Sequence, residues 1–129
     1  MKTLLIMSTD RPHATQMELH NTRKGFEHYL DNLGHTYEVC EGNWEGKREQ
    51  SYMITLPDGL GYSDLKHLAF GRYAQDAILH VTAYGGASLY FNDDTCDFIG
   101  KFVQVDAIPL DNCYTQSFAT GNIYVTQAN

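Results

Sequence analysis

The sequence predicts an α+β domain in which two helices cover one face of an antiparallel sheet. Three observations support this prediction: short segments of alternating apolar and polar residues, two longer segments with helical periodicity, and turn residues between them. The 129 residues include no repeat and no linker rich in Pro, Gly or Ser, so we expect a single domain over 1–129. A hydrophobic fraction of 43% is too high for a disordered chain.

The first two predicted elements are a buried strand and a long helix. The apolar run 3–9 ends at Asp10-Arg11-Pro12, and its short length and proline boundary favour a strand. Apolar residues at helical spacing then predict a helix over 14–33. Gly34 follows in the position where a left-handed residue commonly ends a helix.

The next two predicted elements are strands that alternate between apolar and polar residues. They cover 35–42 and 48–56, with turn residues and two glycines between them. Successive side chains of a strand point to opposite faces, so the second strand has two distinct sides. One side carries Tyr52, Ile54 and Leu56, and the other carries Glu49, Ser51, Met53 and Thr55.

The second half of the chain predicts another helix and several short strands. After a turn at Pro57-Asp58-Gly59, Ser63 is expected to cap a helix that runs to Tyr73. The segment 106–129 is too aromatic for a loose tail, so we expect it to pack on the domain or on a neighbouring subunit. The strands predicted in between cover 77–82, 87–91 and 102–105.

This βαββαβ order with extra C-terminal strands is typical of the ferredoxin-like arrangement, in which both helices lie on one face of the sheet. The second face must then meet water or a partner. Here that face would carry Glu49, Ser51 and Met53, a mixture that suits an interface or a ligand site. Many ferredoxin-like domains bury this face by forming trimers, so we expect a homotrimer. Ordinary half-solvated strand residues are the alternative.

Composition excludes several classes of function. Nine basic residues against sixteen acidic ones give a formal charge of −7, so nucleic acid is not an expected partner. The apolar runs are too short to span a bilayer and no signal-peptide pattern is present, so we expect a cytoplasmic protein with no membrane partner. The three cysteines and six histidines lack metal-ligand spacing, and no cofactor motif occurs, so we expect neither a metal nor a cofactor.

The most unusual segment is 42–52, which contains the only tryptophan, Trp44, followed by Glu49 and Ser51. Glu49 and Ser51 lie two positions apart in a predicted strand, so their side chains point the same way. An aromatic surface beside a fixed negative charge suits a cation that carries an apolar group. We therefore expect all three residues to belong to a binding site. The alternative is a hairpin whose exposed Trp44 packs on a neighbouring molecule.

Other polar residues are candidates for the same site. Ser8, Thr9 and Asp10 close the first predicted strand, where their side chains could contact a ligand. Gln75 lies where the second predicted helix gives way to a strand, a position that often faces a pocket. The sequence contains no nucleophile elbow, phosphate-binding loop or dinucleotide fingerprint, so the chemistry does not follow from a standard catalytic motif.

The sequence resembles the phage enzymes that degrade S-adenosylmethionine, now described as lyases and formerly as hydrolases. The resemblance rests on Gly42, Trp44 and Glu49, on Gln75-Asp76 before a strand, and on the return strand at 87–90. It implies a ferredoxin-like, PII-like homotrimer with sites between the subunits. It also implies cleavage of S-adenosylmethionine to 5′-methylthioadenosine and homoserine lactone. A phage thereby removes the methyl donor and cofactor that host restriction-modification systems need.

In the lyase reaction the nucleophile belongs to the substrate, whose carboxylate attacks its own γ-carbon while a neutral thioether leaves. The protein must bind the substrate in a folded conformation with these atoms in line. Glu49, the candidate catalytic residue, would hold the substrate's ammonium or a ribose hydroxyl. If the reaction is a hydrolysis, Glu49 becomes the candidate base for water.

Two hypotheses from other classes remain. The first is a non-catalytic PII-like trimer that binds a small metabolite at its subunit interface. A phosphate-bearing ligand would need clustered cations, and only Lys47 and Arg48 lie near the predicted site. The second is an acidic inhibitor that mimics DNA, although the acidic residues are too few and too mixed with basic ones for a strong mimic.

Overall fold

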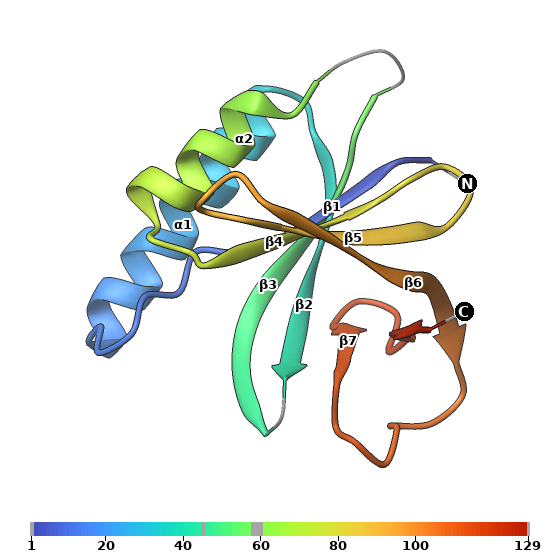
Figure 1. Cartoon of the computed structure of the whole chain (residues 1–129). Helices are drawn as coiled ribbons and strands as arrows, with labels where there is room; N and C mark the ends of the chain where they lie inside the picture. Colours follow the sequence, from blue (N-terminus) through green and yellow to red (C-terminus); the bar gives the residue numbers. More distant parts are fainter. Residues whose placement is uncertain (1, 45, 58–60, 129) are drawn as a thin grey trace.

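The computed structural model describes residues 2–44, 46–57 and 61–128. In these residues eight strands form a closed antiparallel barrel in the order β1-β3-β2-β7-β8-β6-β5-β4, and the helices lie outside it (Figure 1). In chain order the elements are β1 (Leu4–Ser8), α1 (Gln16–Asn32), β2 (Thr36–Trp44), β3 (Lys47–Thr55), α2 (Ser63–His67), the π-helical turn η1 (Leu68–Arg72), β4 (Ala77–Val81), β5 (Gly86–Phe91), β6 (Cys96–Val105), β7 (Tyr114–Ser117) and β8 (Ile123–Gln127).

The prediction of an open, ferredoxin-like and PII-like sheet is wrong. The strands β4, β1, β3 and β2 are antiparallel neighbours, but β5, β6, β8 and β7 continue the sheet from β4 and bring it back to β2. The sheet therefore has an inside instead of a second open face. The side of β3 that was expected to meet water or a partner lines this interior, so the open-face reason for a trimer no longer holds.

Closure depends on β6, which changes neighbours along its length. Its first part pairs with β5 and its second part with β8, so the strand predicted at 102–105 is the end of a ten-residue strand. Gly100 lies at the change with a φ of +120°, and a Cβ there would collide with the backbone of Gln127. The register against β5 also shifts here: Ala87 pairs with Gly100 and Ser88 pairs with Phe98, so Ile99 is an extra residue in β6. Only glycine permits this close approach, which lets one strand serve both neighbours.

The first helix forms as its sequence predicts, with slightly different ends. Thr15 and Glu18 make a reciprocal capping box, in which the Thr15 hydroxyl accepts from the Glu18 N–H at 3.1 Å and the Glu18 carboxylate accepts from the Thr15 N–H at 3.2 Å. Gly34, with a φ of +72°, follows the end of α1. Phe26 and Leu30 are fully buried and fix the face that α1 turns toward the strands.

The second helical segment differs from its prediction. Ser63 is the first residue of α2 instead of its cap, and Tyr62 takes the cap position without a side-chain hydrogen bond. After α2 the chain widens into the π-helical turn η1, which ends before Tyr73. The turn predicted at Pro57-Asp58-Gly59 lies mostly outside the described residues. Among those that are described, no helix is long and apolar enough to span a membrane.

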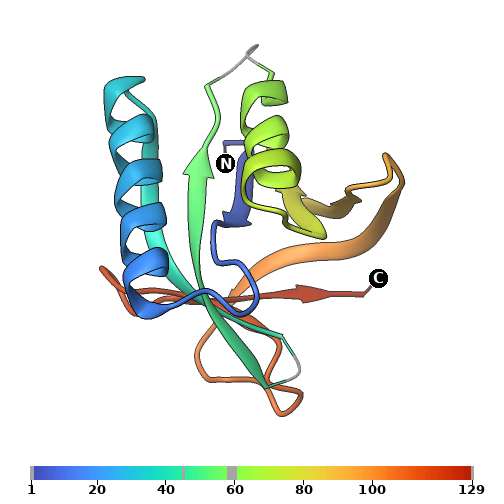
Figure 2. The ribbon, with the colours of Figure 1, turned by 90° about the vertical axis from the view of Figure 1, so that its left-hand side faces the viewer.

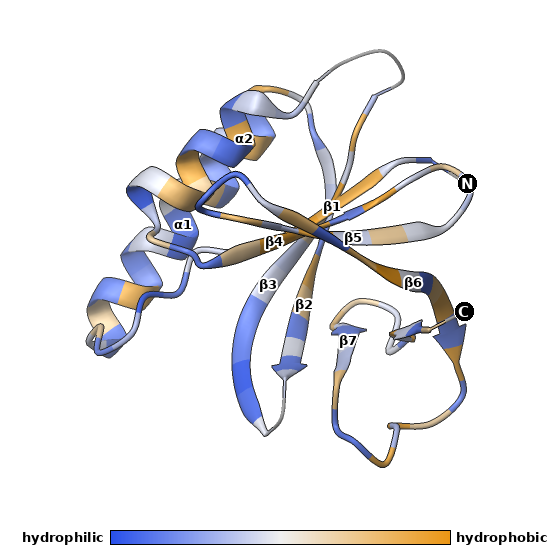
Figure 3. Ribbon diagram, in the orientation of Figure 1, coloured by the Kyte–Doolittle hydropathy of each residue, from blue (hydrophilic) through white to orange (hydrophobic). Residues whose placement is uncertain are grey.

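The protein has two main hydrophobic layers, one on each side of β3. Both helices lie on the same side of the barrel, and Figure 2 shows β3 between them. The outer layer packs β1, β3 and β4 against the helices, and the inner layer fills part of the barrel. As the alternation predicted, Tyr52, Ile54 and Leu56 belong to the outer layer and Met53 to the inner one. Figure 3 shows that β3 turns hydrophilic over the half nearest its hairpin with β2.

The C-terminal segment packs on the domain. The strand β7 pairs with β2, and β8 pairs with both β6 and β7, so these last strands complete the barrel wall. Tyr114, Ile123 and Val125 are buried together in a third, smaller cluster. Tyr114 therefore helps to close the barrel, whereas Phe118 stays 62% exposed.

Candidate functional site

One end of the barrel interior holds a cavity of about 560 Å³, a size that accommodates a cofactor-sized ligand. Every strand contributes to its wall. The side chains that make the wall mainly apolar come from β1, β4, β5, β6, β7 and β8 and include Ile6, Leu79, Leu89, Phe91, Ile99, Phe102, Tyr114, Tyr124 and Val125. The polar residues enter chiefly from the β2–β3 hairpin and from the segments beside β1 and β4.

The β2–β3 hairpin brings its site candidates onto one wall of this cavity. Register pairs Trp44 with Lys47, Gly42 with Glu49, and Cys40 with Ser51. Directly paired residues share a face, so these side chains point the same way. Trp44, Glu49 and Ser51 all line the cavity, with Trp44 58% exposed at its mouth. Their contact with a ligand stays a prediction, but the predicted juxtaposition is present in the fold.

Gly42 keeps space open in front of Glu49. A Cβ at this position would lie 3.5 Å from the Ser51 Oγ and 3.9 Å from the Glu49 Cγ. These are ordinary contacts, and Gly42 has no positive φ, so the backbone itself does not demand glycine here. The missing side chain leaves the cavity open between the carboxylate and the hydroxyl. A larger residue would occupy the volume that a ligand needs.

Ser51 offers a hydrogen bond that the protein does not use. The residue is 5% exposed, and its Oγ has no partner within the described part of the chain. Burying a hydroxyl without a partner destabilises the fold by about 1–3 kcal/mol. Because Ser51 lines the cavity, a bound ligand could supply the missing partner.

Glu49 lies at the rim of the cavity as an exposed residue whose carboxyl is partly enclosed by its neighbours. Partial burial raises the pKa of its carboxyl, and the neighbouring Asp10 carboxylate raises it further. The Lys47 ammonium and the Ser8 hydroxyl lower that pKa, but their combined effect is smaller. The environment therefore disfavours a bare negative charge here, and a bound cation would relieve that penalty.

Ser8 and Gln75 line the cavity close to Glu49, and both side chains are tied to the backbone. The Ser8 Oγ donates to the Gln50 carbonyl at 2.7 Å and accepts from the Asp10 N–H at 3.0 Å. The Gln75 Nε2 donates to the carbonyls of Asp10 at 2.8 Å and Tyr73 at 3.1 Å. With its nitrogen held in this way, Gln75 has its Oε1 left to receive a ligand.

Thr9 is placed differently from its prediction. It is fully buried beside the end of β1, and it is not among the residues that line the cavity. Alternation explains this placement, because Ser8 points into the barrel and its neighbour points toward the helices. Asp10 does not line the cavity either, but its carboxylate accepts from the N–H of Gln50, the residue that follows Glu49.

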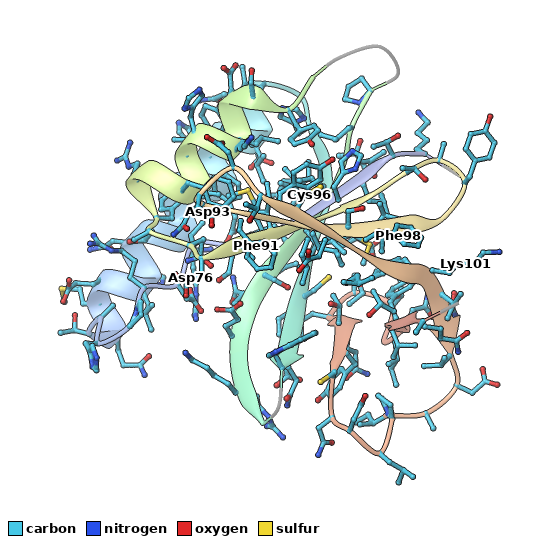
Figure 4. The ribbon with its side chains drawn as sticks, viewed as in Figure 1. Asp76, Phe91, Asp93, Cys96, Phe98 and Lys101 are labelled. Atoms are coloured by element: carbon cyan, nitrogen blue, oxygen red, sulfur yellow. The ribbon has the colours of Figure 1, made fainter. Side chains whose placement is uncertain are left out.

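Sequence reasoning missed most of the cavity wall outside the β2–β3 hairpin. Phe91, the last residue of β5, lies close to Asp76, which precedes β4 and which the sequence indicated only through the family resemblance (Figure 4). The wall also includes Cys113 just before β7. The sequence contained no signal for Phe91 and the other apolar residues of the wall, since apolar strand residues look the same whether they line a core or a cavity.

The charges around the cavity are few. The charged residues of its described wall are Lys47, Glu49 and Asp76, which leaves one excess negative charge when all are ionised. This balance suits a cationic ligand better than a phosphate. Within the described ranges, no group of His, Cys, Asp and Glu could hold a metal ion. That the reaction needs no metal stays a prediction.

Comparison with known protein families identifies a match over nearly the whole chain. The model of the S-adenosylmethionine lyase family matches residues 5–127. The match includes all eight strands except the first residue of β1, as well as the described cavity wall from Ile6 to Thr126. No curated protein matches the sequence.

Proposed function

The chain belongs to the S-adenosylmethionine lyase family, and from that premise we propose that it binds its substrate in the barrel cavity and releases 5′-methylthioadenosine and homoserine lactone. Membership in the family implies cleavage of S-adenosylmethionine. In the proposed step, a substrate carboxylate oxygen forms a bond to the γ-carbon. The bond from that carbon to sulfur breaks, and its electron pair stays on sulfur. The sulfonium becomes a neutral thioether, and no proton needs to move.

The observation that carries this proposal is one cavity with a mainly apolar wall and a group of polar residues. We call this group the polar corner; it consists of Ser8, Glu49, Ser51 and Gln75. The step joins a carboxylate to the carbon beside a cationic sulfur, so both charges disappear along the path. A low-polarity cavity favours such a transition state over a solvated ground state. The apolar strand residues supply that environment, and their fixed positions can hold the substrate folded for in-line attack.

The polar corner provides the groups that would hold the substrate in place. Glu49 would accept a charge-assisted hydrogen bond from the substrate ammonium, and Ser51 would use its unpartnered hydroxyl on a second substrate group. Trp44 would place its ring against the cationic or adenine part of the substrate at the cavity mouth. Ser8 and Gln75 complete this wall. In this proposal Glu49 binds and orients the substrate, and the substrate carboxylate performs the attack.

Hydrolysis is the second candidate, and the raised pKa of Glu49 supports it. A carboxylate with a higher pKa is a better base for activating water. The hydrolase would form homoserine directly, whereas the lyase would form the lactone first. The apolar wall favours the lyase, because water is not a reactant in that reaction.

Product analysis at early times separates these reactions. The purified chain is incubated with S-adenosylmethionine in the presence of EDTA, and the products are separated by chromatography. We expect methylthioadenosine together with homoserine lactone. Homoserine that appears before any lactone would establish the hydrolase, and unchanged substrate would refute the enzymatic proposal. Glu49→Gln serves as the matched variant, since it keeps the side-chain shape and removes the charge.

We further propose that this reaction serves phage anti-restriction in the host cytoplasm, an expectation that the family resemblance supports. Consuming S-adenosylmethionine would deprive restriction-modification enzymes of their methyl donor and cofactor. Expression of the chain should raise the plating efficiency of unmodified phage on a restricting host. Expression of Glu49→Gln at the same level should raise it less.

The homotrimer stays part of the proposal, supported by the resemblance and by Trp44, which is exposed at the cavity mouth where a neighbouring subunit could complete the site. The interface cannot be the inner face of β3, because that face lines the barrel. A trimer should sediment near three times 14.6 kDa. A monodisperse monomer that still cleaves S-adenosylmethionine would show that one chain holds the complete site.

A further inference from the structure

The segment after β1 holds the backbone of the residue between Glu49 and Ser51. The last pair of the β1–β3 ladder joins Ser8 to Ser51, and β3 continues beyond it. Next to Gln50 the strand β1 has ended, and two side chains take its place. The Gln50 N–H donates to Asp10 Oδ2 at 3.1 Å, and the Gln50 carbonyl accepts from Ser8 Oγ at 2.7 Å. Both backbone groups are thus satisfied where the ladder ends.

Asp10 is itself held from the helical side. The Arg23 side chain, from α1, donates to both Asp10 carboxylate oxygens, from Nε at 2.9 Å and from Nη2 at 2.7 Å. The Asp10 side chain is 12% exposed and that of Arg23 is 28% exposed. Such a two-point pair fixes orientation as well as distance. The Asp10 carbonyl accepts from Gln75 Nε2 at 2.8 Å, so one residue connects α1, β3 and the start of β4.

We propose that Asp10, held by Arg23, is a positioning residue for the lyase reaction. This inference rests on the proposed function. Asp10 does not line the cavity, but it holds Gln50, which lies between Glu49 and Ser51, and it holds the side chain of Gln75. A small displacement of binding groups can slow a reaction that depends on alignment by about a hundredfold. The pair therefore acts on the reaction through the polar corner of the cavity.

The charges of Asp10 and Arg23 also influence the pKa of Glu49. Asp10 raises the pKa of Glu49, second to partial burial, while Lys47 on the same face of β3 lowers it. Asp76, next to Gln75, and Cys113, just before β7, also line the cavity. The Arg23 guanidinium offsets the Asp10 charge. Losing Arg23 should therefore raise the pKa of Glu49, and losing the Asp10 charge should lower it.

Three variants test the pair. Arg23→Gln removes the two-point contact and exposes the Asp10 charge to Glu49. Asp10→Asn removes that charge and leaves Arg23 unopposed. Lys24→Gln is the matched control, because Lys24 is the next cation on α1, its side chain is 67% exposed, and it pairs with Glu27 instead of Asp10. We expect kcat/KM for S-adenosylmethionine to fall by about tenfold to a hundredfold in the first two variants, and to stay unchanged in the control.

The decisive readout is the titration of Glu49, followed by NMR on protein with labelled glutamate side chains and assigned by its loss in Glu49→Gln. The pKa of Glu49 should rise in Arg23→Gln and fall in Asp10→Asn. A general loss of stability would not shift the pKa of Glu49 in opposite directions in the two variants. Opposite shifts therefore indicate that the pair acts on Glu49 through Asp10. Equal behaviour of Arg23→Gln and Lys24→Gln in both titration and turnover would overturn the inference.

A fallback keeps the inference testable if Arg23→Gln does not fold. Arg23→Lys retains the positive charge and loses the planar, two-point geometry. We then expect a titration of Glu49 close to that of the unmodified chain, together with a reduced kcat/KM. Unreduced turnover in Arg23→Lys would refute the need for the fixed geometry. If the unmodified chain cleaves no S-adenosylmethionine, the proposed function fails, while the titrations still decide whether the pair controls Glu49.

Discussion

The two faces of β3 differ in how completely their polar side chains find hydrogen-bond partners within the protein. On the outer face Tyr52 is fully buried, its hydroxyl donates to Glu27 at 2.8 Å and accepts from Gln50 at 3.1 Å, and its ring packs edge-on against Phe26. On the inner face the Ser51 hydroxyl has no partner among the described residues, although it is as buried as a core residue. The strand β3 thus contributes a packed, hydrogen-bonded core residue on one side and a buried hydroxyl without a partner on the other.

This difference shows how a small barrel can hold a reactive cavity. The outer layer, with its helices and hydrogen bonds, fixes the backbone of β3. The inner face can then keep an unpaired hydroxyl and a carboxylate with a raised pKa, both unfavourable in the empty state. Substitutions on the outer face should therefore reduce stability, and substitutions on the inner face should reduce substrate binding.

The largest effect is expected on the outer face. Ile54→Ala removes a fully buried side chain beneath the helices and leaves a cavity. The free energy of unfolding should fall by about 2–5 kcal/mol, measured by urea denaturation with circular dichroism. A loss below about 1 kcal/mol would mean that the outer layer does not fix β3 as described.

Gly42→Val should have the largest effect on the inner face. The new Cβ meets only ordinary contacts, and valine suits a strand, so the fold should persist. Its methyl groups would occupy the space between Glu49 and Ser51, and we expect kcat/KM for S-adenosylmethionine to fall by about a hundredfold. Normal turnover by a folded Gly42→Val protein would place the substrate elsewhere.

Glu49→Gln should reduce substrate affinity while sparing the fold. Replacing a charge-assisted hydrogen bond by a neutral one should weaken binding by about 1.5–3 kcal/mol, or about tenfold to a hundredfold, measured by calorimetry with a non-reacting sulfonium analogue. The folded state raises the pKa of Glu49, so its ionisation at higher pH lowers stability. Glu49→Gln should therefore unfold at the same or a higher temperature near neutral pH. A clear drop in that temperature would indicate a structural role instead.

The same pKa determines the pH dependence of the reaction. If ionised Glu49 binds the substrate, activity is lost as pH falls through its raised pKa. The loss should begin at a higher pH than for an ordinary glutamate, whose pKa is about 4.3. The acid limb of the profile should disappear in Glu49→Gln, and a limb that persists unchanged would assign it to another group.

Ser51→Ala should have the smallest effect, with opposite signs for binding and stability. Removing a buried hydroxyl without a partner should leave the free energy of unfolding unchanged or raise it by about 1 kcal/mol. Substrate affinity should fall by about fivefold, because a neutral hydrogen bond contributes about 1 kcal/mol. Reduced stability would show that the hydroxyl has a partner in the folded protein, and would remove it from the proposed site.

Local pattern in the sequence determined the elements of the first half and part of the site. Alternation along β3 separates Tyr52 from Glu49 and Ser51 correctly, because a strand turns successive side chains to opposite faces. The capping box and Gly34 fix the ends of α1 through contacts a few residues apart. The placement of Thr9 follows from the same alternation and was missed because strand-end residues were considered together.

Only the tertiary structure decided that the sheet closes. Closure brings Gly42 beside Thr115 and makes β6 change neighbours at Gly100, and both events join residues far apart in the chain. Strand edges pair through backbone N–H and C=O groups that nearly every residue carries, so the side-chain pattern does not specify which edge meets which. For the same reason, the polar face of β3 could not be assigned from sequence to water, to a partner, or to the opposite wall of its own barrel.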